Sequence, residues 1–520
     1  MLRIVALCTV LATGALLFAQ NAYDEPWRPQ FHFTPARNFM NDPNGLVFYK
    51  GEYHLFYQYN PEGNTWGHMN WGQAVSNDML HWKQLPVAIS EVKGKYMIYS
   101  GSVVVDRDNT SGLCAAKNGD KGCLVAIYTA AVRDAGKDVH QSQYLSYSND
   151  RGRTWTEYPG NPVADLGKPD FRDPKVFWYA PQKKWVMVAV LADERKVEIF
   201  DSHDLKKWKR ESEFGPAGDT VGQWECPDLF ELPVEGSSES KWVLVINRNP
   251  GAPAGGTGTK YLIGSFDGDR FAADAGEGQW ADYGKDFYAT QRFSSLPPAD
   301  TRTVWMGWIS NWQYANKEPT DIWRGAQSLP RALSLKNIAG RVRLVQSPIS
   351  ETKRLREKSL MNVSAVSIAE ANRVIQKAAV DGDTLEIEIA FAPATAKQFG
   401  IMLRKGPREE TTVGFSRPGN TVFVDRTHSG DVGFSKDFPG RQSAPVFDPA
   451  QWSLHIFVDR SSVETFVNGG ETVLTDRIYP ALESRGIQLF SDSPRTKIVS
   501  MRVWKLSSIW RKNSSSGSSE

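Results

Sequence analysis

Three acidic residues are candidates for chemistry because a proline follows each within two positions: Asp42, Asp173 and Glu225. A proline disfavours helical backbone in the residue before it and so keeps the chain extended there. This restriction acts directly on Asp42 and Asp173, but on Cys226 in the third segment. If the three carboxyl groups share one cavity, one can stay protonated and donate a proton while another stays ionised and attacks. Cleavage of glycosidic bonds uses this division of labour.

Each of these segments has a simpler interpretation when it is taken alone. Residues 41–45 form a favourable turn sequence, Arg172 next to Asp173 could be a surface ion pair, and residues 225–227 could be a strand edge. Arg172 would also keep the neighbouring carboxylate charged, which suits the binding of sugar hydroxyls. No Ser/His/Asp arrangement competes with the acids, and the glycine-rich residues 255–258 lack the lysine and the helix of a phosphate-binding loop.

A repeated turn indicates the elements that would position the acids. A serine and, two residues later, an aspartate precede an aromatic residue at similar intervals: Ser76 to Trp82, Ser148 to Trp155, Ser202 to Trp208 and Ser265 to Phe271. Serine and aspartate fold their side chains onto nearby backbone amides, so each copy predicts a tight turn. Three of the turns are preceded by one of the acids and an apolar strand. We therefore expect the acids at equivalent innermost positions in a radial array of sheets, where they would converge on the axis.

The later part of the chain predicts a second all-β unit. Residues 384–391 alternate between apolar and polar side chains, and residues 454–459 and 463–467 read as the two arms of a hairpin. These strands favour a two-sheet sandwich. The capped, charged residues 350–357 read as a linker. We expect a signal peptide at 1–19, the array of sheets at 20–345, a linker at 346–365, the sandwich at 366–510 and a disordered tail at 511–520.

The composition excludes several classes of function. The 61 basic and 59 acidic residues leave a formal net charge of +2, too small for charge-driven binding of nucleic acid or an anionic membrane. After the positive start and apolar stretch of residues 1–19, no other stretch is apolar enough to cross a membrane. The sequence therefore predicts a secreted or periplasmic protein. It gives no indication of the oligomeric state.

Cysteine usage agrees with an oxidising compartment. Cys114 and Cys123 flank a short polar turn, so we expect a local disulfide, although two free thiols in a loop are the alternative. Cys226 is then left unpaired. With no matching cluster of histidines, these cysteines argue against a structural zinc site.

Four sequence blocks in this order resemble the signature blocks of the invertase, inulinase and levanase family, glycoside hydrolase family 32: residues 41–45, 100–102, 171–174 and 224–227. The resemblance covers nearly the whole chain after the leader. It implies an all-β fold, a five-bladed β-propeller followed by a β-sandwich, and a retaining mechanism on β-linked fructofuranosides. It implies no metal and no organic cofactor.

The resemblance also implies a role for individual residues. Asp42 is similar to the family's nucleophile, Glu225 to its acid/base, and Asp173 to the acid that binds fructose hydroxyls and stabilises the transition state. Seven further residues match positions that line the fructose pocket, although core packing is the alternative for the two tryptophans: Asn41, Gln58, Trp66, Ser102, Arg172, Tyr288 and Trp312.

The substrate is indicated less sharply than the family. Residues 308–316 and 323–326 resemble microbial exo-acting levanases and inulinases more than sucrose-specialised invertases. We therefore predict release of terminal fructose from fructan, with sucrose as a second substrate. A sucrose-specialised invertase or a fructosyltransferase would use the same residues. A fructan-binding module without turnover is the alternative of another class, and it would most simply have lost one of the three acids.

Overall fold

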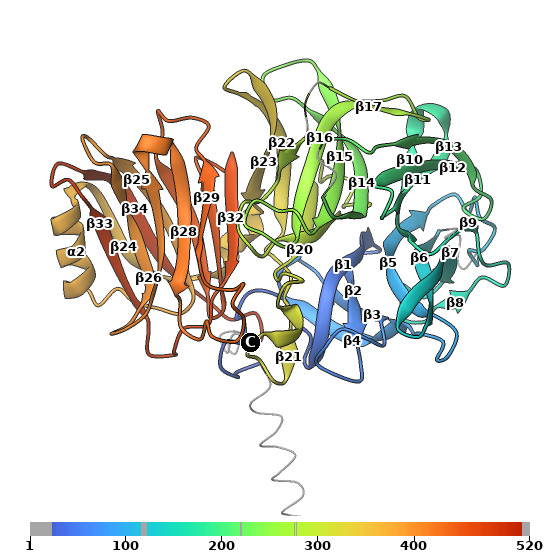
Figure 1. Cartoon of the computed structure of the whole chain (residues 1–520), viewed down its shortest axis with the longest axis horizontal. Coiled ribbons are helices and arrows are strands. Elements are labelled where there is room, and N and C mark those ends of the chain that lie inside the picture. Colours follow the sequence, from blue (N-terminus) through green and yellow to red (C-terminus); the bar gives the residue numbers. More distant parts are fainter. Residues whose placement is uncertain (1–22, 116–121, 219–220, 275, 277, 512–520) are drawn as a thin grey trace, which may run out of the picture.

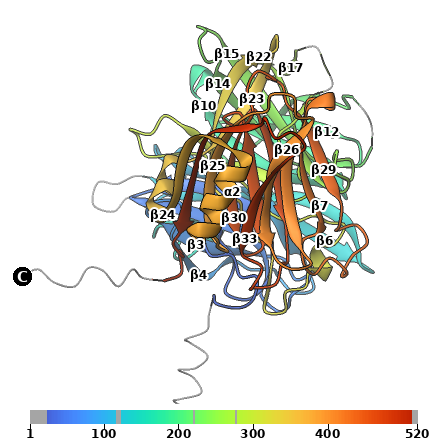
Figure 2. The ribbon, with the colours of Figure 1, turned by 90° about the vertical axis from the view of Figure 1, so that its left-hand side faces the viewer.

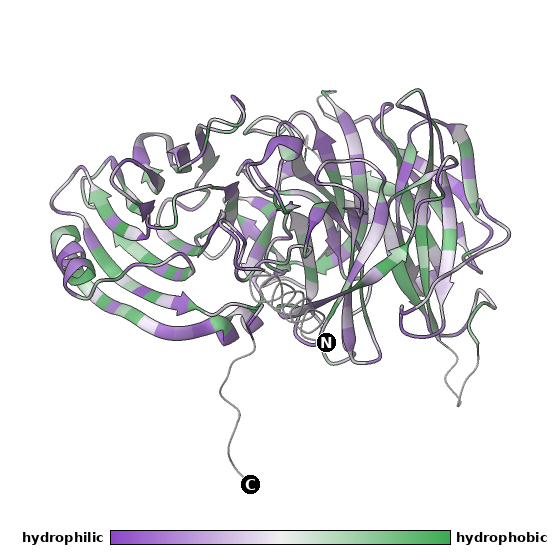
Figure 3. Cartoon of the chain, turned by 90° about the horizontal axis from the view of Figure 1, so that it is seen from below, coloured by the Kyte–Doolittle hydropathy of each residue, from purple (hydrophilic) through white to green (hydrophobic). Residues whose placement is uncertain are grey.

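The computed structural model describes residues 23–115, 122–218, 221–274, 276 and 278–511, which are folded almost entirely into strands. The expected signal peptide at 1–19 and residues 512–520 of the expected tail lie outside the described residues. Within the described part the strands form seven sheets, five on one side of the molecule and two on the other (Figure 1). Hydrophobic and hydrophilic residues are mixed along the strands on both sides (Figure 3), and some strands, such as Lys184–Leu191 and Ser462–Val467, are buried along their whole length.

Five sheets surround a common axis. Their innermost strands are β1 (Asn38–Tyr49), β5 (Met97–Asp106), β10 (Phe171–Tyr179), β14 (Gln223–Pro233) and β19 (Tyr288–Arg292). Each of these strands packs against the next in this order, and β19 packs back against β1. The ring of contacts therefore closes, which is the arrangement of a five-bladed β-propeller.

Each blade continues outward as an antiparallel meander. The second strands are β2 (Glu52–Asn60), β6 (Cys123–Asp134), β11 (Lys184–Leu191), β15 (Ser240–Asn249) and β20 (Thr303–Trp308). The third are β3 (Asn70–Ser76), β7 (Lys137–Ser148), β12 (Lys196–Ser202), β16 (Gly258–Phe266) and β22 (Arg331–Ile338). The fourth are β4 (Trp82–Ile89), β8 (Thr156–Glu157), β13 (Lys209–Phe214), β17 (Phe271–Ala273) and β23 (Arg341–Pro348). Three short strands add to these sheets: β9 (Ala164–Lys168) beside β7, β18 (Gln279–Trp280) beside β16 and β21 (Trp323–Arg324) beside β1.

The repeated serine–aspartate turn joins the third strand to the fourth strand in four of the blades. In the first blade, Asp78 Oδ1 accepts hydrogen bonds from the backbone N–H groups of Leu80 and His81. Asp150, Asp204 and Asp267 accept backbone N–H groups in the same way. The sequence repeat therefore marks one such turn in each of these four blades. In each turn the aspartate side chain accepts backbone N–H groups that have no partner in a neighbouring strand.

The two remaining sheets pack face to face as a sandwich, with an apolar core between them. One has the order β24 (Arg356–Ser367), β34 (Lys497–Leu506), β25 (Leu385–Ala392), β30 (Ser453–Asp459), β31 (Ser462–Val467) and β32 (Thr472–Arg477). The other has the order β29 (Arg441–Pro445), β28 (Thr421–His428), β27 (Glu410–Ser416), β26 (Gln398–Lys405) and β33 (Gly486–Ser491).

The helices are few and short. The helix α2 (Ile368–Lys377) packs against β33 and β24 at the end of the sandwich that faces away from the propeller (Figure 2). Ser367 caps it by accepting the N–H of Glu370, and Ala371 and Ile375 are buried beneath it. Short 3-10 turns occur at η1 (Ala180–Gln182), η2 (Ala315–Lys317), η3 (Ser350–Leu355) and η4 (Arg417–Gly419). No described helix has both the length and the apolar character needed to cross a membrane.

The segment expected as a linker is largely regular structure. Residues 346–365 contain the end of β23, the turn η3 and most of β24, which pairs with β34 in the sandwich. Its charged residues lie in η3 and at the start of β24, the edge strand of its sheet, where Lys353, Arg354, Glu357 and Lys358 are exposed.

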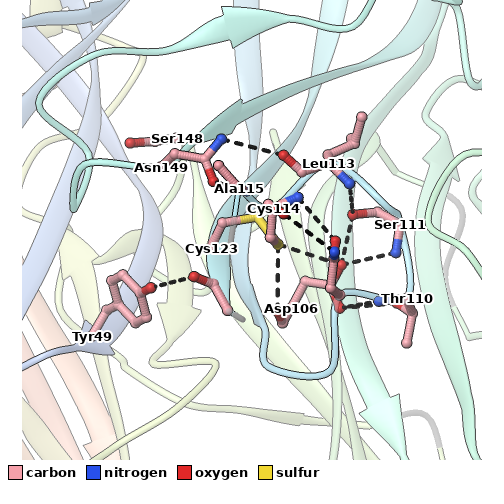
Figure 4. The surroundings of a disulfide bond; sticks show 12 residues. Tyr49, Asp106, Thr110, Ser111, Leu113, Cys114, Ala115, Cys123, Ser148 and Asn149 are labelled. Atoms are coloured by element: carbon pink, nitrogen blue, oxygen red, sulfur yellow. Dashed lines mark hydrogen bonds between the residues drawn. A yellow bond between two sulfur atoms is a disulfide. The ribbon is translucent and has the colours of Figure 1, made fainter. Parts of the chain in front are cut away.

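A disulfide joins Cys114 to Cys123, with an S–S distance of 2.08 Å (Figure 4). Next to it, Asp106 accepts hydrogen bonds from the backbone N–H groups of Thr110 and Ser111, which hold the turn that carries Cys114. Tyr49 of the neighbouring blade donates its hydroxyl to the carbonyl of Gly122 over 2.7 Å. The disulfide thus anchors the start of β6 to the turn that leaves β5.

Candidate active site

The innermost strands all depart from regular pairing at the same level of the propeller. The pairing shifts between Met40 and Pro43 in β1, between Arg172 and Lys175 in β10, and between Glu225 and Asp228 in β14. The shift in each strand spans or adjoins one of the three acids. Because each proline lacks an N–H group, it cannot complete the ladder there, and an irregularity of this kind turns a side chain out of its usual direction. The local sequence thus explains why these acids point toward the axis.

The acids open into one cavity of about 320 Å³. Eight of the residues expected in the site line it: Asn41, Asp42, Gln58, Trp66, Arg172, Asp173, Glu225 and Trp312. Six further lining residues were not predicted: Tyr99, Ser100, Asp138, Gln223, Asn249 and Asn316. The cavity is therefore built mainly from the innermost strands and from the loops at one face of the ring.

Asp42 is buried, and its neighbours fix the direction of its carboxylate. Asn41 Nδ2 donates to Asp42 Oδ1 over 3.0 Å, and Ser100 Oγ donates to Oδ2 over 2.7 Å. Cys226 Sγ lies 3.4 Å from the same Oδ2. Burial raises the pKa of Asp42 to about 6; the nearby charge of Glu225 also raises it, while the hydrogen bonds from Ser100 and Asn41 lower it.

Asp173 has left-handed backbone with φ at 62°, and Cys226 has φ at 43°, so the extended backbone expected before the proline is wrong at these two positions. The backbone N–H of Asp173 donates to Thr129 Oγ1 over 3.0 Å, and its Oδ2 accepts the backbone N–H of Cys226 over 2.9 Å. Burial raises the pKa of Asp173, the neighbouring Arg172 lowers it, with Nε 3.8 Å from Oδ2, and the charge of Glu225 raises it. Together these effects leave the pKa at about 7. A non-glycine residue at such a φ costs conformational free energy. Residues held in such conformations by their surroundings are common at functional sites.

Glu225 has a different donor on each carboxylate oxygen. Arg172 Nη2 donates to Oε1 over 3.0 Å, and the hydroxyl of Tyr288 donates to Oε2. The same Nη2 donates to Gln223 Oε1 over 3.0 Å. Although burial lowers the pKa of Arg172, the charges of Glu225 and Asp173 outweigh it and leave that pKa raised. One guanidinium thus serves two of the three acids.

Cys226 connects the other two acids. Its N–H and its thiol both face Asp173 Oδ2, and its thiol also faces Asp42 Oδ2. Burial raises the pKa of the Cys226 thiol, so it stays neutral. Sequence reasoning treated it as an unpaired cysteine, and its position directly after Glu225 was the only signal of a place in the site.

Ser102 does not line the cavity. It is buried between β5 and β10, where Oγ donates to the carbonyl of Pro174 and accepts the N–H of Val176, both at 2.9 Å. Both hydrogen bonds of its hydroxyl therefore join two neighbouring blades. Ser100, two residues earlier in the same block, occupies the place in the cavity, because the pairing of β5 shifts between Ile98 and Gly101.

Tyr288 is also almost fully buried, and it reaches the site only through its hydroxyl on Glu225. The two expected tryptophans do face the cavity. The Trp312 ring stacks on Phe39 at 6.1 Å between centroids, and the Arg133 guanidinium lies 4.9 Å from the centre of the Trp66 ring.

Two buried polar atoms beside the acids have no partner in the protein: Asn41 Oδ1 and Gln58 Nε2. Buried polar groups in native structures are nearly always hydrogen-bonded, so these two are available to a polar ligand. Among the described residues, the three clusters of acidic and histidine side chains compact enough to hold a metal ion include none of the cavity acids.

The axial cavity of the propeller brings Asp42, Asp173 and Glu225 together beside Arg172, and paired carboxyl groups of this kind are what glycoside cleavage needs. The chain matches the N-terminal domain of glycosyl hydrolases family 32 over residues 32–348 and the C-terminal domain of that family over residues 351–505. The chain therefore belongs to glycosyl hydrolases family 32, and it is a glycoside hydrolase with β-fructofuranosidase activity.

Individual relatives agree with this assignment. The chain is 45% identical to a levanase of Bacillus subtilis over 98% of this chain and 75% of the levanase. It is 40% identical to an extracellular exo-inulinase of Aspergillus niger over 98% and 100% of the two chains. The crystal structure of an exo-inulinase from Aspergillus awamori superimposes with a TM-score of 0.84 at 38% identity, over 94% of this chain and 100% of that one.

Proposed function

We propose that this chain releases terminal β-fructofuranosyl units from fructans, and fructose from sucrose, with retention of configuration. The observation that carries the proposal is that Asp42 and Glu225, from separate blades, line one cavity together with Asp173. Retaining hydrolysis needs one carboxylate that attacks and one carboxyl group that protonates.

In the first step Asp42 attacks the anomeric carbon, and Glu225 gives its proton to the departing oxygen. The carbon–oxygen bond of the glycoside breaks, and an ester to Asp42 forms. In the second step Glu225 takes a proton from water, whose oxygen displaces Asp42 and restores both side chains. The Tyr288 hydroxyl can donate to ionised Glu225 or accept from protonated Glu225, so this contact supports both steps.

The other cavity residues would hold the sugar. Asp173 and Arg172 are placed to bind fructose hydroxyls, and the unpartnered atoms of Asn41 and Gln58 offer an acceptor and a donor. Trp66 and Trp312 give the apolar faces on which sugar rings stack. We also propose that the chain is exported through residues 1–19, which agrees with its disulfide and with relatives named as extracellular.

The test is to replace the attacking group. Asp42→Asn should lower fructose release from levan, inulin and sucrose by at least about a thousandfold, since amide nitrogen and oxygen do not replace the nucleophile. The exposed Asp108→Asn is the matched control and should be unchanged. Near-normal release by Asp42→Asn would show that the role given to Asp42 is wrong.

A second variant separates the acid from the nucleophile. Glu225→Gln should lose activity on natural fructosides but keep much more of it on a fructoside whose activated leaving group needs no protonation. An equal loss on both substrates would contradict the acid role of Glu225. Oligomers of several units among the products of inulin or levan would contradict the exo action.

A further inference from the structure

A second hollow of about 340 Å³ lies beside the active-site cavity. Three loops form it: the connection between β2 and β3, the connection between β4 and β5, and the hairpin between β6 and β7. Among its lining side chains are His68, Glu91, Lys95, Tyr96 and Arg133. We call this hollow the side groove.

The side groove and the active-site cavity are two sides of the same structural wall. Trp66 lines the cavity, and the next residue, Gly67, lines the side groove. Arg133 of the side groove lies 4.9 Å from the Trp66 ring centre, and its Nε lies 3.1 Å from Oδ1 of Asp138, which lines the cavity. A ridge of three side chains, Trp66, Arg133 and Asp138, thus separates the two hollows.

The chemistry of the side groove suits a neutral polyhydroxylated chain. Tyr96 is half-buried, its ring lies 5.1 Å from that of Tyr144, and its hydroxyl donates to Glu157 over 2.8 Å. The aromatic ring is therefore held in place on the groove wall, and a fixed ring face of this kind binds the apolar face of a sugar. Glu91 Oε1 lies 3.0 Å from His68 Nδ1, and Arg133 forms an ion pair with Asp138. Charges of both signs in the groove thus have partners within the protein, so the groove favours hydroxyl groups over a strongly charged ligand.

We propose that the side groove is a binding site for fructosyl units of a fructan chain beyond the bond that is cleaved. The proposal rests on the proposed function, because the chain must enter the active-site cavity with its terminal unit. A polymer that leaves the cavity over the Trp66–Arg133 ridge meets the side groove next. Sucrose has only one sugar unit on the far side of its bond and is too short to use it.

The expected consequence is a dependence on chain length. Tyr96→Ala should lower kcat/KM on long levan or inulin by about fivefold to tenfold, the size expected when one sugar–aromatic contact is lost. Its kcat/KM on sucrose should stay within about twofold, because nothing in the cavity changes. Tyr96→Phe keeps the ring and should behave like the parent on all substrates. Trp178→Ala, which removes a 40% exposed aromatic side chain from β10, is the control for loss of surface aromatic area.

A binding measurement removes any effect on the chemical step. In an Asp42→Asn background, calorimetric titration with a five-unit fructan should show weaker binding when Tyr96→Ala is added, and titration with sucrose should show no difference. Levan and inulin oligosaccharides used in separate arms tell which linkage the groove prefers. Equal losses on sucrose and on long fructan, or no loss on either, would overturn the side-groove proposal. Absence of fructose release by the parent enzyme would instead overturn the proposed function.

Discussion

Two regions of this protein bury charged side chains, completely at the domain interface and largely in the active-site cavity, and the balance of acids and bases differs between them. Where the propeller meets the sandwich, each basic group lies between acids. His32 contacts Asp459 and Glu464 at 2.8 and 2.7 Å, and Arg331 contacts Glu464 and, at 3.1 Å, Asp282. In the active-site cavity, Arg172 is shared by Asp173 and Glu225, whereas Asp42 accepts hydrogen bonds from the neutral side chains of Asn41 and Ser100.

The ionisation of the buried acids reflects this difference. At the interface, although burial raises the pKa of Glu464, Arg331 and His32 lower it to about 2. Burial lowers the pKa of His32, but the hydrogen bonds that its ring donates to Asp459 and Glu464 outweigh burial and raise that pKa to about 9. In the cavity, the pKa values of Asp42 and Asp173 are raised instead. At the interface, buried charges have partners of opposite sign, and these pairs join the two domains. In the cavity, the acids outnumber their basic partner, and their pKa values lie near neutral pH, where catalysis can use them.

The interface is not uniformly balanced. Burial raises the pKa of Asp476, Arg426 lowers it, and the charge of the neighbouring Asp286 raises it, which together leave it at about 7. Both regions therefore contain a surplus carboxylate, and they differ in the local ratio of acidic to basic side chains. The following substitutions test it.

The largest effect on stability is expected at the interface. Glu464→Gln leaves His32 and Arg331 without their shared acid and should reduce the free energy of unfolding by about 3–5 kcal/mol, the cost of breaking a buried pair. Denaturant unfolding monitored by tryptophan fluorescence measures it. A loss below 1 kcal/mol would mean that the interface charges contribute no more than surface charges.

The opposite sign is expected in the cavity. Asp173→Asn should increase the free energy of unfolding at pH 8 by about 2–4 kcal/mol, because a pKa raised from 3.8 to about 7 means that ionisation disfavours the folded state. The contribution of protonated Asp173 to stability is complete below pH 3.8 and is lost as the pH rises through about 7. The gain should therefore vanish near pH 4, and thermal melts at both pH values check this. A gain that is equal at both pH values would contradict the explanation.

A smaller effect is expected on the pH profile. In the proposed mechanism Asp42 attacks in its ionised form, so kcat/KM should fall as the pH drops through about 6. Ser100→Ala removes a donor that favours the ionised form and should move this acid limb upward by about 0.5–1 pH unit. Ser102→Ala is the matched control, because its hydroxyl contacts only backbone atoms of β10. An unchanged limb in Ser100→Ala would remove that bond from the control of Asp42.

The smallest effect is expected for a surface pair. Lys168 and Glu194 form an exposed ion pair at 2.9 Å, and Glu194→Gln should change the free energy of unfolding by less than about 1 kcal/mol. Measured with Glu464→Gln under the same conditions, it isolates the contribution of burial. Equal effects of the two variants would mean that burial does not set the cost.

The convergence of the acids and the radial array of sheets could be predicted because their signals are local, whereas the number of blades and the role of each acid followed only from the resemblance to the family blocks. Proline after Asp42 or Asp173 and the repeated serine–aspartate turn act within a few residues. The exchange of Ser100 for Ser102 could not be predicted, because it depends on a shift in strand pairing that sequence alternation does not reveal.

Residues brought by distant loops were missed for a related reason. Asp138 lies on a hairpin of the second blade and Asn249 at the end of β15, and nothing near either residue indicates the cavity. The partners at the domain interface are equally distant in sequence, as with His32 and Glu464, so no local pattern pairs them. The exposed charged residues of η3 and of the start of β24 likewise resembled a linker.

The short strand β21 has a consequence for biosynthesis. It pairs in parallel with β1 through Asn38 and Phe39, at the start of the strand that carries Asp42. The first blade emerges early from the ribosome, yet this edge stays open until Trp323 and Arg324 have been made. The strand that carries Asp42 thus gains its last pairing partner late in propeller assembly. A nascent chain that ends before Trp323 keeps an unpaired strand edge that can pair with another chain.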